Sequence, residues 1–363
     1  MQQIIVDFGT FDFLGLQIPL RIFGYGLAMV LGFMTGIYMA QLRAQRAGES
    51  PEPIGYCGLL ALVGGIIGAR IAYVVENYRY FFPEHGGASS GLAEMLNITS
   101  GGLIYYGGVA LATILVLAFL WAKQLPIRRF IDIVAPSLMI GLAFGRLGCL
   151  LNGCCYGSLC RPDWPLAMRF PMYSKPLVKL DGRDNPYSLS TEAPSPAFAS
   201  QLKNHVIKPG PWLTYDTGNL IPPHNFTPEQ VHIAESMRSQ PVKPAQLLGI
   251  LNGLVLAAIL LAFGRLRRRE GQVFALLAIL YPTTRFLEEL IRADNTHNVA
   301  RGILTHNQYT SIILTMVGIV FWLILYRVPA SAGPTLAGRL AAIGGPQGLA
   351  PQGNQKRKRD KRN

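Results

Sequence analysis

The chain has 363 residues, of which half are hydrophobic and only 15% are charged, and its formal net charge is +13. A soluble protein usually carries about 25% charged residues, so this composition excludes an ordinary globular enzyme and predicts membrane helices. The positive charge is gathered in short loops and in the C-terminal run at residues 356–359. That distribution is typical of membrane topology, so we expect no nucleic-acid partner.

The apolar residues fall into seven runs, each close to the roughly 20 residues that a helix needs to cross a bilayer. The runs are residues 19–40, 54–75, 103–122, 130–151, 246–263, 273–291 and 309–326. Most are rich in Gly and Ala, which let helices approach closely in lipid. The expected fold class is therefore an all-α polytopic membrane protein with about seven transmembrane helices.

Lys and Arg mark one side of the membrane. They follow the first, third and fifth runs, for example at Arg43, Arg128 and Arg265, whereas residues 1–16 have none. Cytoplasmic loops carry the excess of basic residues, so we expect the N-terminus outside and the C-terminus inside.

The same reasoning divides the chain into four parts. These are residues 1–153 with four membrane helices, 154–242 as a head or lid on the outer face, 243–328 with three helices, and 329–363 as a disordered basic cytoplasmic tail.

A first group of polar residues closes the fourth run. Arg146 lies about two turns from the end of that run and is followed by Asn152 and Gly153. A charged side chain in lipid is costly and usually functional, and an arginine fork suits phosphate oxygens. The alternative is an arginine that only anchors its helix at the interface. The neighbouring glycines and Asn152 favour a binding site.

A second group ends the sixth run. Arg285, Glu289 and Arg292 stand at i, i+4 and i+7, so they are expected to share one helical face, with Glu289 holding both arginines. A purely structural ladder of salt bridges is the alternative.

Two further groups complete the candidate site. Tyr106, Gly107 and Gly108 open the third run, and Arg70 and Tyr25 lie near the outer ends of the second and first runs. A tyrosine here can instead belong to an interfacial aromatic belt. All four groups are expected to converge in the outer half of the membrane, where an anionic lipid headgroup could bind.

Four of the five cysteines lie within twelve residues, at positions 149, 154, 155 and 160. The spacing has no CxxC pair and no neighbouring histidine, so no metal site is expected. A disulfide from Cys154 or Cys155 to Cys160 is the favoured interpretation.

The segment Gly145-Arg146-Leu147-Gly148, followed by Asn152-Gly153 and Gly157, resembles the signature of the prolipoprotein diacylglyceryl transferase family of bacterial inner-membrane enzymes. The resemblance continues in matching order at Tyr25-Gly26-Leu27, Gly68 to Ile71, Gly101-Gly102, Gly107-Gly108, Asp132, Ala135-Pro136, Pro244, Gln246-Leu247, Arg285, Glu289, Arg292 and Gln308. The family usually has histidine where this chain has Tyr106, and asparagine where it has Cys149.

The resemblance implies that a diacylglyceryl group moves from phosphatidylglycerol to the lipobox cysteine of a preprolipoprotein. A thioether forms, glycerol phosphate leaves, and no metal or organic cofactor is needed. Arg146 and Arg285 would meet the charge of the phosphate, and Tyr106 would donate a hydrogen bond to it. The thiol proton would pass to solvent, to Glu289 or to the leaving group. The remaining substrate contacts would come from Tyr25, Arg70, Gly107, Gly108, Asn152, Gly153 and Arg292.

Two other functions remain open from the residues. One is a related lipid transferase with another acceptor, which the tyrosine at position 106 suggests. The other is a non-enzymatic transporter or lipid-binding protein, in which the charges would line a pathway.

Overall fold

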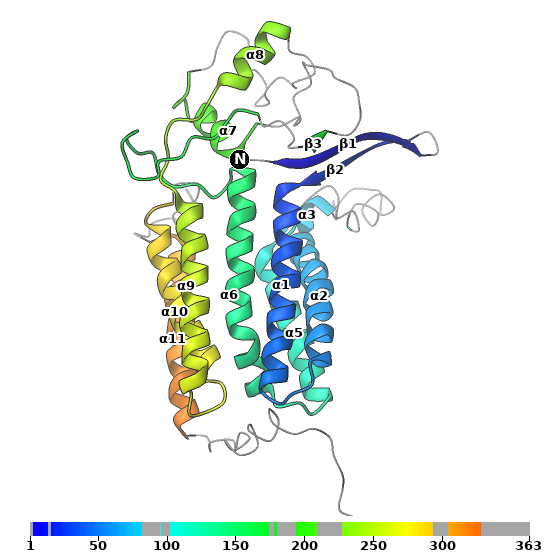
Figure 1. Ribbon diagram of the computed structural model, residues 1–363, viewed down its shortest axis with the longest axis vertical. Helices are drawn as coiled ribbons and strands as arrows, with labels where there is room; N and C mark the ends of the chain where they lie inside the picture. The colour runs from blue at the N-terminus through cyan, green and yellow to red at the C-terminus, as the bar shows by residue number, and fades with distance from the viewer. Residues whose placement is uncertain are drawn as a thin grey trace, which may run out of the picture.

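The computed structural model describes residues 3–13, 16–81, 95, 102–173, 178–179, 194–208, 227–292 and 304–327 (Figure 1). Long helices stand side by side beneath a layer of strands and short helices, which we call the head (Figure 1). Within the described residues, six helices are long and apolar enough to cross a membrane: α1 (Gly24–Arg46), α2 (Glu52–Glu76), α5 (Tyr105–Ala122), α6 (Ile127–Asn152), α9 (Ala245–Leu266) and α11 (His306–Arg327). The protein is therefore a mainly helical, multi-pass membrane protein, as the composition predicted.

A seventh long helix, α10 (Gln272–Glu289), coincides with the sixth apolar run. Its 18 residues include three charged ones, Arg285, Glu288 and Glu289, so it is not counted as a span by composition alone. It nevertheless packs along α11 and touches α9 and α6. Charged residues in a helix so placed must face the protein interior, which makes their location informative about function.

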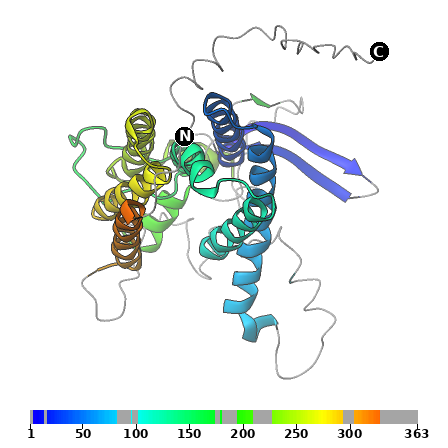
Figure 2. The same ribbon diagram turned by 90° about the horizontal axis from the view of Figure 1, so that it is seen from below.

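The helices pack in two groups joined by α6. In the view along the bundle, α1, α2 and α5 lie on one side of α6 and α9, α10 and α11 lie on the other (Figure 2). The principal contacts are α1 with α6, α2 with α5, α6 with α9, and α10 with α11. The outward faces are apolar and exposed, as at Met34, Ile114 and Met316. Such a surface is suited to lipid and not to water.

Glycines allow the close helix crossings, as expected where packing replaces the hydrophobic drive. A Cβ atom on Gly107 would lie 2.2 Å from the Cβ of Ala72 and 2.6 Å from the carbonyl oxygen of Gly68 in α2. One on Gly108 would lie 2.7 Å from the carbonyl oxygen of Gly65. The structure thus places Gly107 and Gly108 against α2, where they pack the bundle.

We expect Gly107→Ala to destabilise the protein by about 1–3 kcal/mol, because the added methyl overpacks the crossing of α2 and α5. Gly65→Ala is a matched control on α2, since a Cβ there meets nothing within 4 Å. Thermal unfolding of both variants in detergent measures the difference. Equal midpoints of thermal unfolding for the two variants would contradict this prediction and would mean that α2 and α5 can move apart to admit the methyl group.

The head contains a small sheet that the sequence analysis did not predict. Strand β1 (Ile4–Phe13) pairs antiparallel with β2 (Leu16–Phe23) and parallel with β3 (Val178–Lys179). Helices α7 (Pro196–Lys203) and α8 (Pro228–Ser236) lie above it (Figure 1). Buried residues that include Met172, Phe198 and Leu202 give this layer a hydrophobic core of its own.

The first membrane helix begins later than predicted. Residues 19–40 were interpreted as a span, but residues 16–23 form β2 and α1 starts at Gly24. Apolar residues alternate with others at Leu16, Ile18, Leu20 and Ile22, which is the period of a strand. The apolar run was therefore a strand joined directly to a helix.

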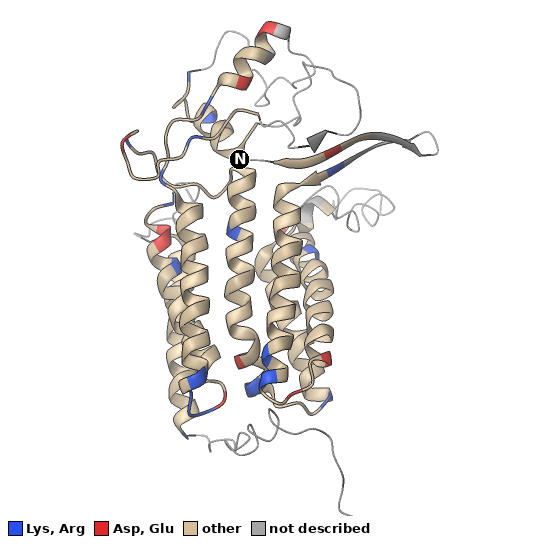
Figure 3. Ribbon diagram, in the orientation of Figure 1, with Lys and Arg blue, Asp and Glu red and all other residues tan. Residues whose placement is uncertain are grey.

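The end of the bundle opposite the head is basic (Figure 3). Buried Asp132 of α6 holds it together: its carboxylate pairs with Arg267 at 2.5 Å. The same carboxylate accepts hydrogen bonds from the backbone N–H groups of Gly271 at 2.7 Å and Phe274 at 2.9 Å. Arg43 of α1 donates to the carbonyl oxygens of Asp132 and Ile133. One carboxylate thus caps the start of α10 and joins it to α6 and to the loop after α9.

The predicted tail, residues 329–363, lies outside the described residues, as do parts of the predicted head and Gly101. The short helix α3 (Tyr78–Phe81) follows α2 at the head end.

Candidate active site at the head end of the bundle

Arg146 of α6 meets the last turn of α10 beneath the head. Its Nη2 lies 3.2 Å from Oε2 of Glu288. Asn252 of α9 donates from Nδ2 to the other oxygen of Glu288 at 2.8 Å and to Thr284 at 3.0 Å. Arg146, Asn252 and Glu288 therefore tie three helices together through one carboxylate.

The space for Arg146 is made by a glycine. A Cβ atom on Gly249 of α9 would lie 3.0 Å from Cγ, Cδ and Nε of Arg146, so the arginine runs directly across the α9 backbone. The arginine side chain is 11% exposed and its partner Glu288 is 14% exposed. The guanidinium is thus mostly removed from water but still reachable.

Arg285 lies one turn before Glu288 on α10 and forms the second charged pair. Its Nη1 lies 2.6 Å from Oε2 of Glu289, the i, i+4 partner that the sequence predicted. The other oxygen of Glu289 accepts hydrogen bonds from Thr305 at 3.2 Å and Asn307 at 3.1 Å. The Glu289 side chain is 1% exposed, whereas that of Arg285 is 14% exposed.

The start of α11 is built to present Thr305 and Asn307 to that carboxylate. The backbone N–H of Thr305 donates to the side chain of Gln308, and the N–H of Gln308 donates to the Thr305 hydroxyl. This reciprocal capping box fixes the first turn of the helix. Gln308 is buried, so the cap is protected from water.

Arg292 lies where the sequence analysis did not place it. It was expected on the same helical face as Arg285 and Glu289, but α10 ends at Glu289. Arg292 follows in extended backbone that pairs with Gly157 in the first segment of the head. The sequence predicted one helix through Arg292, because the turn after Glu289 contains neither Gly nor Pro to mark the end of the helix.

The charges of this region favour an anion. Arg146 pairs with Glu288 and Arg285 pairs with Glu289, and Arg292 follows the end of α10, so three positive charges less two negative charges leave one positive charge. A phosphodiester carries one negative charge, so its arrival would neutralise the site. Arginine is the residue best suited to bind phosphate through paired N–H groups.

Tyr106 and His306 approach this region from α5 and α11. The Tyr106 hydroxyl donates to Oδ1 of Asn307 at 3.4 Å. The rings of Tyr106 and His306 meet edge to face, with centroids 6.4 Å apart. Both side chains are exposed. Tyr106 therefore lies within the candidate site, next to a histidine that the sequence analysis did not single out.

The side chain of Arg70 is held by two backbone carbonyl oxygens and an aromatic ring. It is 7% exposed, donates from Nε to the carbonyl oxygen of Met95 at 2.8 Å, and donates from Nη1 to that of Gly102 at 3.1 Å. Its guanidinium also lies 5.2 Å from the ring centroid of Tyr73. These contacts fasten the segment before α5, which favours a structural role for Arg70.

The other predicted contacts surround the end of α6. Tyr25 packs on Gly148, where a Cβ would lie 3.0 Å from its ring. Asn152 is the last residue of α6, and its carbonyl oxygen accepts from Gln3 of the head. Gly153 ends the helix with φ of 77°, a conformation that favours glycine.

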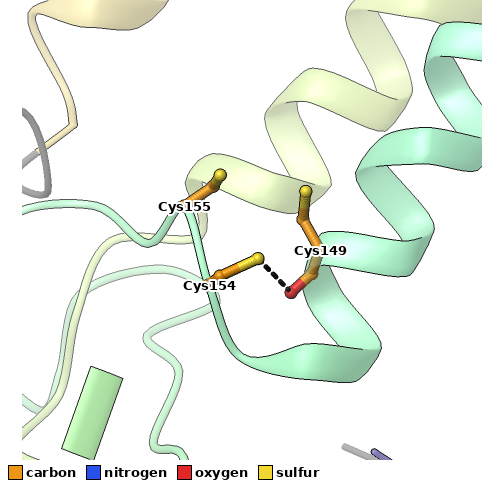
Figure 4. Close-up of side chains that lie close together, drawn as sticks. All are labelled: Cys149, Cys154 and Cys155. Carbon is orange, nitrogen blue, oxygen red and sulfur yellow. Dashed lines mark hydrogen bonds between the residues drawn. The ribbon is translucent and has the colours of Figure 1, made fainter. Parts of the chain in front are cut away.

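Three cysteines gather at the same helix end. The Sγ atoms of Cys149, Cys154 and Cys155 lie within 4.8 Å of one another (Figure 4). All five cysteines are free, so the predicted disulfide to Cys160 is not present. The pKa of the Cys155 thiol is lowered by hydrogen bonds from the other two thiols, and the charge of Arg292 acts in the same direction.

Sequence reasoning missed Glu288, Asn252, Asn307 and His306. Each had a weak signal, because a carboxylate, an amide or an imidazole in or beside an apolar helix needs a polar partner in lipid. The contact partner of each residue could not be predicted from spacing; Arg146 and Glu288, for example, are 142 residues apart in the sequence.

A bundle of apolar helices with mostly buried, ion-paired arginines at one end defines a multi-pass membrane protein with a candidate anion-binding site. The chain matches the family described as prolipoprotein diacylglyceryl transferase over residues 13–324, and it belongs to that family. It is a transferase.

Three relatives named phosphatidylglycerol–prolipoprotein diacylglyceryl transferase illustrate the similarity. The chain is 36% identical to the protein of Rhodopirellula baltica over 54% of its own length and 40% of that longer protein. It is 23% identical to that of Clostridium tetani, over 83% of this chain and 92% of the relative. It is 28% identical to that of Burkholderia thailandensis, over 85% of this chain and 92% of the relative.

Proposed function

We propose that this chain transfers the diacylglyceryl group of phosphatidylglycerol to a cysteine thiol of a prolipoprotein, in lipoprotein maturation. The observation that carries the site assignment is that Arg146 and Arg285 converge on one turn of α10, each paired with a glutamate. In the reaction the thiolate sulfur bonds to the glycerol carbon, the carbon–oxygen bond to phosphate breaks, and glycerol phosphate leaves with the electron pair. The acceptor is the lipobox cysteine that follows a signal peptide.

The two arginines act on the leaving group. Negative charge increases on the phosphate oxygens as the carbon–oxygen bond breaks, and fixed cations in a site removed from water stabilise that charge. Glu288 and Glu289 hold the guanidinium groups in place before the lipid arrives. Little reorganisation is then needed at the moment of reaction.

The thiol proton needs an acceptor, because only the thiolate is nucleophilic. Glu289 is poorly suited, since Arg285, Thr305 and Asn307 already occupy its oxygens. Tyr106 is a weak base at neutral pH. His306 contacts the Tyr106 ring and is exposed. We assign His306 as the proton acceptor, with Tyr106 donating to the phosphate.

We expect His306→Gln to lower kcat about 100-fold with little change in KM, because general base catalysis is lost while the arginines still bind lipid. His232→Gln is the matched control, an exposed histidine on α8. A kcat within threefold of the parent in folded His306→Gln protein would assign the proton to another group.

The reaction itself is tested with the purified full chain in phosphatidylglycerol vesicles and a lipobox peptide. Mass spectrometry should show one diacylglyceryl group on the peptide cysteine, and a peptide with serine at that position should stay unmodified. Folded protein that yields no product contradicts the proposal. Complementation of a bacterial strain that lacks its own transferase separates lipoprotein maturation from transfer to another acceptor.

The bundle's basic end faces the cytoplasm in this proposal, with the head and the site on the outer side of the inner membrane. The gathering of Lys and Arg at one end supports it, because cytoplasmic ends carry the basic excess (Figure 3). Residues 154–242 then belong to the outer head. Both substrates reside in the bilayer and reach the site by lateral diffusion.

A further inference from the structure

The three clustered cysteines have no part in the transfer reaction described above. Their Sγ atoms turn toward the same space from the last turn of α6 and from the loop that follows it (Figure 4). Cys154 and Cys155 return to Cys149 because Gly153 reverses the chain at φ of 77°.

The backbone conformation that brings Cys155 back is itself unfavourable. Its φ is 56°, in the left-handed region that a residue with a Cβ rarely adopts. Such a conformation persists where the surroundings determine it, and it is common at functional sites.

The loop that carries the cluster is held on both sides. Gln246, which is fully buried, donates to the carbonyl oxygen of Cys154 at 2.8 Å. Further along, the N–H of Gly157 donates to Lys243 and that of Ser158 donates to Ile291. The cysteines are therefore presented by a fixed frame, as a preorganised ligand set requires.

A metal site and a disulfide require different distances between the sulfur atoms. A bond of about 2.3 Å from metal to sulfur separates the sulfurs of a three- or four-coordinate site by about 3.8–4.0 Å, whereas the sulfurs of a disulfide lie about 2.05 Å apart. The observed limit of 4.8 Å needs only a small contraction to enclose an ion. All three cysteines can be ligands at once, whereas a disulfide would use two and leave one.

We propose that Cys149, Cys154 and Cys155 bind a thiophilic d¹⁰ cation, Cu⁺ or Zn²⁺, beside the candidate headgroup site. Thiolates select such soft cations over Mg²⁺ or Ca²⁺. Three sulfurs complete a trigonal Cu⁺ site, whereas Zn²⁺ needs a fourth ligand such as water.

The test uses the reduced, chelator-treated full chain in detergent. Cu⁺ is titrated against a chromophoric Cu⁺ chelator, Zn²⁺ is titrated separately, and bound metal is measured by mass spectrometry of the elements. We expect one ion per chain, release of protons on binding, and at least tenfold weaker binding in Cys149→Ser and Cys155→Ser. Cys160→Ser, in the same segment, should bind as the parent does.

Two results overturn the proposal. One is a titration in which folded, reduced protein binds neither Cu⁺ nor Zn²⁺ stoichiometrically, or in which the Cys149→Ser protein binds the metal as tightly as the parent. The other is a disulfide within the cluster in protein extracted from membranes without reductant, detected by peptide mass mapping. None of these measurements depends on transferase activity, so they stand apart from the proposed function.

Discussion

Arg146→Ala and Arg285→Ala are each expected to lower diacylglyceryl transfer by about 10²–10³-fold, the loss typical of removing one donor from an oxyanion-stabilising site. Each substitution removes a guanidinium that meets the charge of the leaving phosphate. Arg285→Ala also leaves Glu289 buried without its ion-pair partner, so its thermal midpoint should fall further than that of Arg146→Ala. Initial rates with the lipobox peptide measure the effect.

The control for these variants is Arg161→Ala, which removes an exposed arginine of the head. Arg146→Lys separates charge from geometry, because lysine keeps the positive charge but has no rigid fork of donors. Its activity should lie between those of the parent and Arg146→Ala. Rates within threefold of the parent for a folded Arg146→Ala protein would remove this residue from the mechanism.

Asp132→Ala is expected to destabilise the protein by about 3–5 kcal/mol, the range for breaking a buried ion pair from one side. The substitution leaves Arg267 without its carboxylate and the backbone N–H groups of Gly271 and Phe274 without an acceptor. Asp132→Asn keeps one acceptor oxygen and should lose less stability than Asp132→Ala. The midpoint of thermal unfolding in detergent measures the loss of stability in both variants.

Asp163→Ala provides the comparison, since Asp163 is exposed in the head. The double variant Asp132→Ala with Arg267→Ala should be more stable than the sum of the single losses, because the two side chains interact directly. Additive losses would show that Asp132 acts through its backbone hydrogen bonds alone.

The membrane helices and the principal charged residues were predictable because they follow from local rules. A helix must satisfy its own backbone in lipid, so length and hydropathy identify it. The pair of Arg285 and Glu289 is four residues apart on one helix, and it is present as predicted. Gly153, which ends α6, also follows from a local preference for glycine in the left-handed conformation.

What could not be predicted depends on contacts between distant segments. The sheet joins residues near the N-terminus to Val178 and Lys179. Spacing in the sequence gave no sign that Cys149, Cys154 and Cys155 would meet, because their convergence depends on the reversal after Gly153. The hydrogen bonds from Arg70 to the carbonyl oxygens of Met95 and Gly102 likewise join positions 25 and 32 residues apart in the sequence.

The two ends of the molecule are fastened very differently. At the basic end, charged groups centred on Asp132 and on the pairing of Arg129 with Glu49 and Glu270 link α1, α6 and α10. At the head end, α5 meets α11 through a 3.4 Å hydrogen bond from exposed Tyr106 to Asn307. Separation of α5 from α11 at the head end would therefore break this neutral hydrogen bond and leave the ion pairs of the basic end intact.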